Sequence, residues 1–111
     1  MKKGKAEVDS TDEDGQTCLS IASGEAHLEF LRYLVEEGKA EVDKVDSVGK
    51  TPLFIASMNG HLEVVRWLVE KGKAEVYKAM NSGWTPFEVA LNEGHSEVVK
   101  WLTDLFRQVS K

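Results

Sequence analysis

Residues 49–72 read GKTPLFIASMNGHLEVVRWLVEKG, a stretch that predicts two short helices joined by a tight turn. Thr51-Pro52 is a helix start, because threonine can cap a helix and proline fits its first turn without losing a hydrogen bond. Asn59-Gly60 ends this first helix, since glycine adopts the left-handed conformation that closes a helix. A second helix is expected from His61 until Gly72, with its apolar residues at helical spacing. Neither helix is long enough to be stable alone in water, so each needs neighbours to pack against.

The same pattern recurs at an offset of 34 residues. The hexapeptide GKAEVD occupies residues 4–9 and 38–43, and GKAEVY follows at 72–77. The second and third copies are expected at the exit from a second helix, and the first is interpreted as the tail of a partial leading repeat. When residues 15–48 are aligned with residues 49–82, 19 of the 34 positions are identical. A single compact core does not need such internal similarity. A fixed period of this length indicates a repeat architecture, in which each unit buries its apolar face on the next one.

Three stretches of the chain resemble the ankyrin repeat family. Residues 49–72 and GWTPFEVALNEGHSEVVKWL (83–102) carry the threonine-proline helix start and the glycine-histidine turn of that family, and GQTCLSIASGEAHLEFLRYLVEEG (15–38) matches more loosely. The resemblance implies an all-α repeat solenoid of stacked helix-turn-helix pairs with β-hairpin-like finger loops. We divide residues 1–111, a single ankyrin-repeat domain, into a partial leading repeat with the first finger (1–13), repeats at 14–47 and 48–81, and a third repeat with an extended C-terminal helix (82–111).

The composition excludes several classes of protein. Hydrophobic residues make up 41% and charged residues 30% of the chain, an ordinary globular balance. The formal net charge of −5 disfavours a nucleic-acid or anionic-membrane surface, which needs clustered Lys and Arg. The apolar runs are too short to span a bilayer, and no secretory signal follows the N-terminal lysines. With a single cysteine, Cys18, nothing in the sequence favours an oxidising compartment, so the cytoplasm is the expected location.

The fragments that suggest catalysis or metal binding are incomplete. Gly49-Lys50-Thr51 is similar to the end of a phosphate-binding loop, but Lys44 stands where that loop needs its first glycine. The three histidines recur one per repeat, too far apart to share an ion, and each is expected to bond backbone groups in its own helix–helix turn. Cys18 is interpreted as a small buried residue in place of proline. We therefore predict a non-enzyme with no cofactor and no metal.

Large rings also recur at the 34-residue spacing, at Tyr33, Trp67 and Trp101. They fall on the second helix of each unit, beside core leucines. Because amphipathic rings often cover seams, we expect a ladder of rings packed across the repeat boundaries. A stripe that binds a partner is the alternative interpretation.

The resemblance implies that the domain binds another protein or peptide through its finger tips and the concave first helices. We expect the binding residues at positions of these regions where the three copies differ. Trp84 is the expected anchor, because aromatic residues and methionine are enriched in interface cores. The predicted protein-binding residues are Glu13, Asp14, Gln16, Glu25, Ser47, Val48, Lys50, Met58, Asn59, Tyr77, Met80, Asn81, Ser82, Trp84, Asn92 and Glu93.

Two other functions fit the same sequence. The near-identical GKAEV links favour an engineered or excised ankyrin-repeat scaffold with no evolved partner, whereas the uneven first repeat, with Cys18 and Ala26, argues against an ideal consensus design. Weak self-association through uncapped ends is the second alternative. It rests on the expectation that Leu19, Ile21 and Leu31 face a missing neighbour at the first helix pair.

Overall fold

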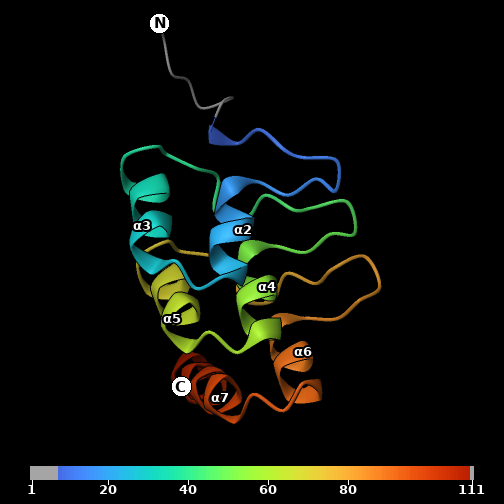
Figure 1. The fold of residues 1–111 in the computed structure, drawn as a ribbon. Helices are drawn as coiled ribbons and strands as arrows, with labels where there is room; N and C mark the ends of the chain where they lie inside the picture. Colours follow the sequence, from blue (N-terminus) through green and yellow to red (C-terminus); the bar gives the residue numbers. More distant parts are fainter. Residues whose placement is uncertain (1–7, 111) are drawn as a thin grey trace, which may run out of the picture.

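A computed structural model describes residues 8–110, and their side chains as far as residue 108. Six helices lie within this range, arranged as three antiparallel pairs that stack into two rows (Figure 1). The inner row holds α2 (Cys18–Gly24), α4 (Pro52–Asn59) and α6 (Pro86–Asn92), and the outer row holds α3 (Leu28–Glu36), α5 (Leu62–Glu70) and α7 (Ser96–Ser110). The expected all-α solenoid is confirmed.

A loop projects from the inner row ahead of each of its helices, all on the same side of the molecule (Figure 1). Each loop closes on itself through a backbone hydrogen bond, from Asp12 N–H to Gln16 O, from Asp46 N–H to Lys50 O and from Met80 N–H to Trp84 O. We call these loops finger 1 (residues 12–16), finger 2 (46–50) and finger 3 (80–84). Within residues 8–110 no strand is formed, so the fingers are hairpin-like turns.

Each inner helix begins as its sequence predicts. The side chains of Thr17, Thr51 and Thr85 accept hydrogen bonds from N–H groups in the first turn of α2, α4 and α6. Cys18, however, is exposed, so its interpretation as a buried residue is wrong. Pro52 and Pro86, which occupy the equivalent place, are buried in units that have a preceding unit, and α2 is the first inner helix described.

The core lies between the two rows. Leu53, Leu68 and Leu102 are at most 1% exposed, and the central helix α4 packs as closely on α2 as on α6. Alanines at the repeating positions 22, 56 and 90 are equally buried and allow the inner helices to approach each other. The middle unit is thus covered on both sides, and stability depends on contacts between units.

The GKAEV exits are also tied to one another. The carboxylate of Asp9 accepts a hydrogen bond from Glu41 N–H at 3.0 Å, and that of Asp43 accepts one from Glu75 N–H at 3.2 Å. Partial burial is the largest influence on Asp43 and raises the pKa of its carboxyl above the usual range. Each aspartate therefore holds the exit of the following repeat in register.

His61 and His95 connect successive units instead of bonding within their own turns, so that expectation is wrong. The ring Nε2 of His61 lies 3.0 Å from the carbonyl of Gly24, and that of His95 lies 2.9 Å from the carbonyl of Met58. Because a carbonyl only accepts, Nε2 carries the proton in both rings. His27 differs, since its exposed ring lies 3.6 Å from the Glu25 carboxylate.

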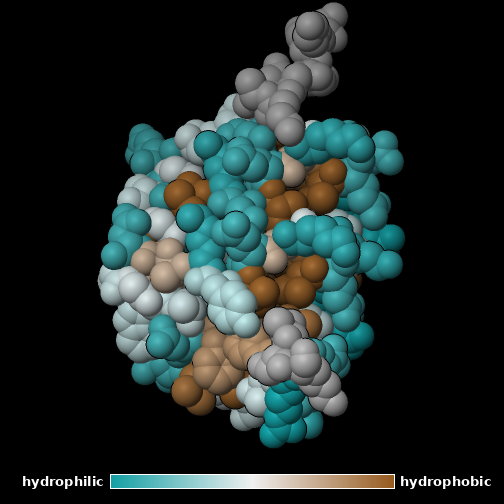
Figure 2. All heavy atoms as spheres, turned by 180° about the vertical axis from the view of Figure 1, so that it is seen from behind, coloured by the Kyte–Doolittle hydropathy of each residue, from teal (hydrophilic) through white to brown (hydrophobic). Residues whose placement is uncertain are grey.

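The predicted ladder of rings is also wrong. Tyr33 is 60% exposed, and Trp67 and Trp101 are half-buried against the core. Among the described residues, the rings in contact are instead Phe106 with Tyr77, at 5.2 Å between centroids, and Phe106 with Phe87, at 5.7 Å. Seen from behind, the apolar atoms form separate patches broken up by hydrophilic ones (Figure 2).

The first helix pair exposes fewer apolar side chains than its sequence predicts. Leu19 and Leu31 are buried, at 1% and 0% exposure, because both point between α2 and α3 into the core. Ile21 is 40% exposed, as expected, and Phe30 on α3 is 50% exposed. The equivalents of Ile21 in the second and third units, Ile55 and Val89, are only 5% and 7% exposed. The equivalents of Phe30, which are Val64 and Val98, are fully buried at 0%. These are the positions that a preceding unit covers.

Candidate protein-binding surface

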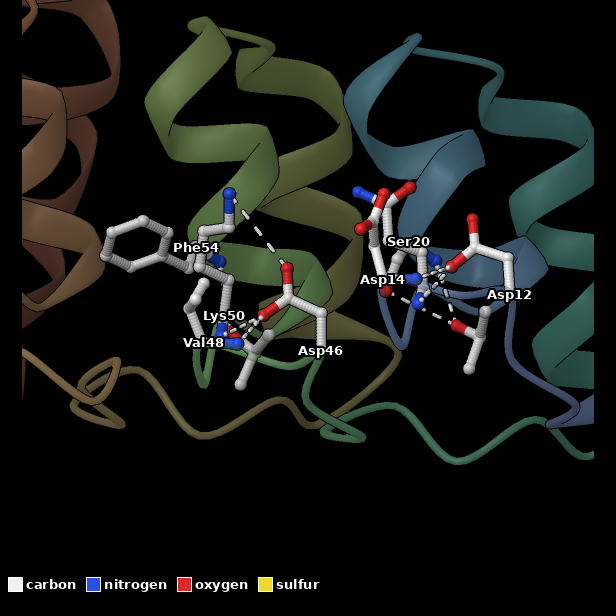
Figure 3. Close-up of polar contacts among 10 residues, drawn as sticks. Asp12, Asp14, Ser20, Asp46, Val48, Lys50 and Phe54 are labelled. Atoms are coloured by element: carbon white, nitrogen blue, oxygen red, sulfur yellow. Dashed lines mark hydrogen bonds and ion pairs between the residues drawn. The ribbon is translucent and has the colours of Figure 1, made fainter.

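Fingers 1 and 2 are held rigid by an aspartate at their base. One oxygen of Asp12 accepts hydrogen bonds from the N–H groups of Asp14, at 3.0 Å, and Gln16, at 2.9 Å. In finger 2, Asp46 makes the same pair of bonds with Val48 and Lys50, at 3.0 and 2.9 Å (Figure 3). This side-chain turn satisfies backbone groups that the tip would otherwise leave to water.

Neighbouring fingers are also joined edge to edge. Ser47 N–H donates to Asp14 O at 3.0 Å, and Asn81 N–H donates to Val48 O at 2.9 Å. Gly49 makes the second contact possible, because a Cβ there would lie 2.4 Å from the Asn81 side-chain oxygen and its φ is +87°. The three fingers therefore form one continuous rim.

Finger 3 departs from the pattern, because Met80 stands where the other fingers have aspartate. It closes by backbone bonds, including one from Gly83 N–H to Met80 O at 2.8 Å. Without a carboxylate at its base, its side chains Met80 and Trp84 are available to face the inner helices. This is the least polar of the three fingers.

A hollow lies between finger 2 and finger 3, with α4 and α6 behind it. Phe54 and Val89, which are 2% and 7% exposed, are buried apolar side chains in its wall, and Trp84, which is 41% exposed, stands at its edge. We call this the α4-side hollow; it is lined by Lys50, Phe54, Met58, Met80, Ser82, Trp84, Val89 and Asn92.

A second hollow, the α6-side hollow, shares Trp84, Ser82 and Asn92 with the first. Its other lining residues are Gly83, Glu88 and Leu91. Glu88 belongs to a capping box in which its Oε1 accepts hydrogen bonds from Thr85 N–H at 3.1 Å and from the Thr85 hydroxyl at 3.3 Å. Trp84 is thus common to an apolar hollow and to one that contains a fixed carboxylate.

Six predicted binding residues line the α4-side hollow together, namely Lys50, Met58, Met80, Ser82, Trp84 and Asn92. Glu13, Asp14 and Gln16 lie on finger 1, Ser47 and Val48 on finger 2, and Asn81 on finger 3, while Glu25 and Glu93 follow α2 and α6. Asn59 has a structural contact, since its side-chain amide donates to Gly24 O at 3.0 Å. Tyr77 lies apart from this group, because its ring stacks on Phe106 of α7.

Besides Gly83, sequence reasoning missed four residues of these hollows, Phe54, Val89, Glu88 and Leu91. A signal was present for three of them. Phe54 and Glu88 occupy one repeating position that holds Ser20 in the first unit, and Leu91 aligns with Ser23 and Ser57. The fourth, Val89, resembles its equivalents Ile21 and Ile55, so comparison of the copies could not single it out.

Acidic side chains dominate the finger side of the molecule. In the three fingers and the three inner helices the one lysine or arginine is Lys50, whose Nζ lies 3.9 Å from the Asp46 carboxylate. Carboxylates in the same elements are those of Asp12, Glu13, Asp14, Asp46 and Glu88. These elements therefore carry more negative than positive charge, which favours cationic groups.

Two further kinds of site were sought in the part of the chain that the structure describes. No group of three or more His, Cys, Asp or Glu side chains there is arranged to hold a metal ion. None of the helices between residues 8 and 110 has the length and apolar character to cross a membrane.

The family model described as "Ankyrin repeats (3 copies)" matches residues 1–79 and 39–110, which together span nearly the whole chain. No curated protein sequence matches the chain. Proteins of the matched family are generally protein–protein interaction modules. The matched residues include all three helix pairs, their Thr-capped inner helices and their connecting fingers. The chain belongs to the ankyrin repeat family.

Proposed function

We propose that this chain is a non-catalytic module that binds a protein or peptide segment along the fingers and inner helices, with Trp84 as the anchor. The observation that carries the proposal is the position of Trp84 between two hollows, 41% exposed on the rim that the joined fingers form. Lys50 and Gln16 occupy the matching places in the other units, so the fold does not need a large ring there. Exposed aromatic side chains that border an apolar pocket are the usual anchors of protein interfaces.

The substitution Trp84→Ala separates a binding role from a structural one. We expect the free energy of unfolding to change by no more than about 0.5 kcal/mol, because the helix start depends on Thr85 and Pro86 and not on the ring. Affinity for a partner captured with the intact protein should fall by at least about 2 kcal/mol. Thermal melts and calorimetric titration measure the two quantities on the same variant.

Tyr33→Ala is a matched control, since Tyr33 is an even more exposed ring on the outer helix α3. It should leave both stability and affinity nearly unchanged. A large loss of stability in Trp84→Ala, without a specific loss of affinity, would sink the anchor hypothesis. The alternative of an engineered or excised scaffold with no evolved partner predicts that no captured protein depends on Trp84.

We also propose a reducing location such as the cytoplasm. The support is Cys18, which is exposed at the start of α2 and makes no disulfide. An exposed thiol persists in a reducing compartment and is prone to oxidation elsewhere. Localisation of the tagged protein, with fractionation as a second measurement, tests this assignment.

Weak self-association is a second candidate, favoured by the exposure of Ile21 and Phe30 at positions that are buried in the following units. We propose that a second copy covers this end. Sedimentation across a concentration range should show a mass that increases with concentration, and the double substitution of both residues by serine should abolish the increase. A strictly monomeric protein at high concentration would contradict the proposal.

A further inference from the structure

Basic side chains are scarcer on the fingers and inner helices than on the outer helices, which carry charges of both signs. The outer helices carry Arg32, Arg66, Lys100 and Arg107, whereas the fingers and inner helices hold one base, Lys50, which lies beside Asp46. A partner lying along the fingers and inner helices therefore meets more carboxylates than cations, and the one base within these elements is already close to a carboxylate. Complementarity of charge across an interface favours a cationic partner segment.

The α6-side hollow has the composition of a site for a single cationic side chain. It brings together the Trp84 ring, the Glu88 carboxylate, the Leu91 side chain and the Asn92 amide. A guanidinium stacks on an indole face and pairs with a carboxylate, and its aliphatic stem packs on an apolar surface such as that of leucine. The α4-side hollow, with Phe54, Met58, Met80 and Val89, suits an apolar side chain instead.

The carboxylate in this hollow is held in place. Both hydrogen bonds to Thr85 engage Oε1 of Glu88, so the group is positioned without any ligand. Because the Glu88 carboxylate is already positioned, its side chain loses less conformational entropy when a partner forms the pair. Arginine suits such a site better than lysine, because its planar fork matches both the carboxylate and the ring.

Stacking of another helix pair on α6 fits this surface poorly. Glu88 aligns with Ser20 and Phe54 of the first two units. Those two residues are covered by the next unit and are only 1% and 2% exposed. A unit placed there would take the Glu88 carboxylate out of water, which is costly unless it brings a cation. The same position is accessible to an incoming basic side chain.

We propose that the α6-side hollow binds an arginine of the partner segment, while the α4-side hollow receives a large apolar residue of the same segment. Trp84 separates the two subsites and contacts both side chains. This inference rests on the proposed function and specifies the chemistry of the partner. It predicts a basic segment in which an arginine and a bulky apolar residue are close in sequence.

The test uses a randomised linear peptide library displayed on phage, selected on the intact protein. Enriched peptides should pair an arginine with a large apolar residue. Glu88→Gln should weaken their binding by about tenfold, the scale of a lost charge-assisted hydrogen bond. Glutamine preserves the capping box, so the melt should not change. Glu97→Gln on α7 makes the same change of net charge outside the hollow and should alter binding by less than about twofold.

A second measurement is independent of any effect on folding. Replacing the peptide arginine by citrulline, its uncharged isostere, should weaken binding to the intact protein and have little further effect on Glu88→Gln. Peptides that depend on Trp84 but lack a basic residue, or that bind Glu88→Gln unchanged, overturn this inference but not the proposed function. Selected peptides that bind Trp84→Ala as well as the intact protein, or a failure to select any, overturn the proposed function itself.

Discussion

Deleting residues 82–111 is expected to leave a poorly folded protein. The deletion removes α6 and α7 and leaves two helix pairs, fewer than the three that a repeat array usually needs. It uncovers the face of α4 that packs on α6, including the nearly buried ring of Phe54. It also removes His95, whose ring bonds the Met58 carbonyl at 2.9 Å. Circular dichroism should show lost helicity and a broad melt at low temperature.

Removal of residues 108–111 alone is the control for this deletion. This shorter truncation retains Phe106, which packs against Tyr77 and Phe87, and it should melt cooperatively near the temperature of the full chain. If the long deletion melts as cooperatively as the full chain, then the units do not depend on one another. That outcome would contradict the solenoid as the source of stability.

The sequence predicts the helices well because local signals determine where they begin and end. Thr51-Pro52 and Thr85-Pro86 start α4 and α6, and Gly60 ends α4 in a left-handed conformation with φ of +77°. Burial depends on neighbours, and a period alone does not show which neighbours a unit has. Cys18 is exposed for this reason, although its equivalents are buried prolines. The same holds for His61 and His95, whose bonding partners Gly24 and Met58 lie in the preceding unit.

The candidate surface was predictable to the extent that the copies differ. Divergence among the three units selected Lys50, Met80 and Trp84, which line one hollow. Tyr77 also diverges from Asp9 and Asp43, but for another reason. Where those aspartates hold the next exit segment, the third unit continues as α7, and the tyrosine ring packs on Phe106 of that helix. Divergence therefore marks both binding positions and the adaptations of a terminal unit, and only three-dimensional contacts separate them.

Leu68→Ala should strongly destabilise the protein. The side chain is 0% exposed on α5 and belongs to the core cluster formed by both rows of helices. Truncation leaves a cavity in the central unit, which is covered by units on both sides and cannot easily collapse, so we expect a loss of about 2–5 kcal/mol. In chemical denaturation, an unchanged slope of unfolding free energy against denaturant concentration would assign the effect to stability rather than to a change in the unfolded state.

Leu91→Ala removes the same atoms from a leucine that is 58% exposed on α6. It should change the free energy of unfolding by no more than about 0.5 kcal/mol, because no cavity is formed at an exposed site. Both substitutions remove the same side-chain atoms. The difference between the two losses of unfolding free energy therefore reports the effect of burial. Equal losses at both positions would mean that burial between the rows is not what holds the repeats together, and a small loss at Leu68 would place the core elsewhere.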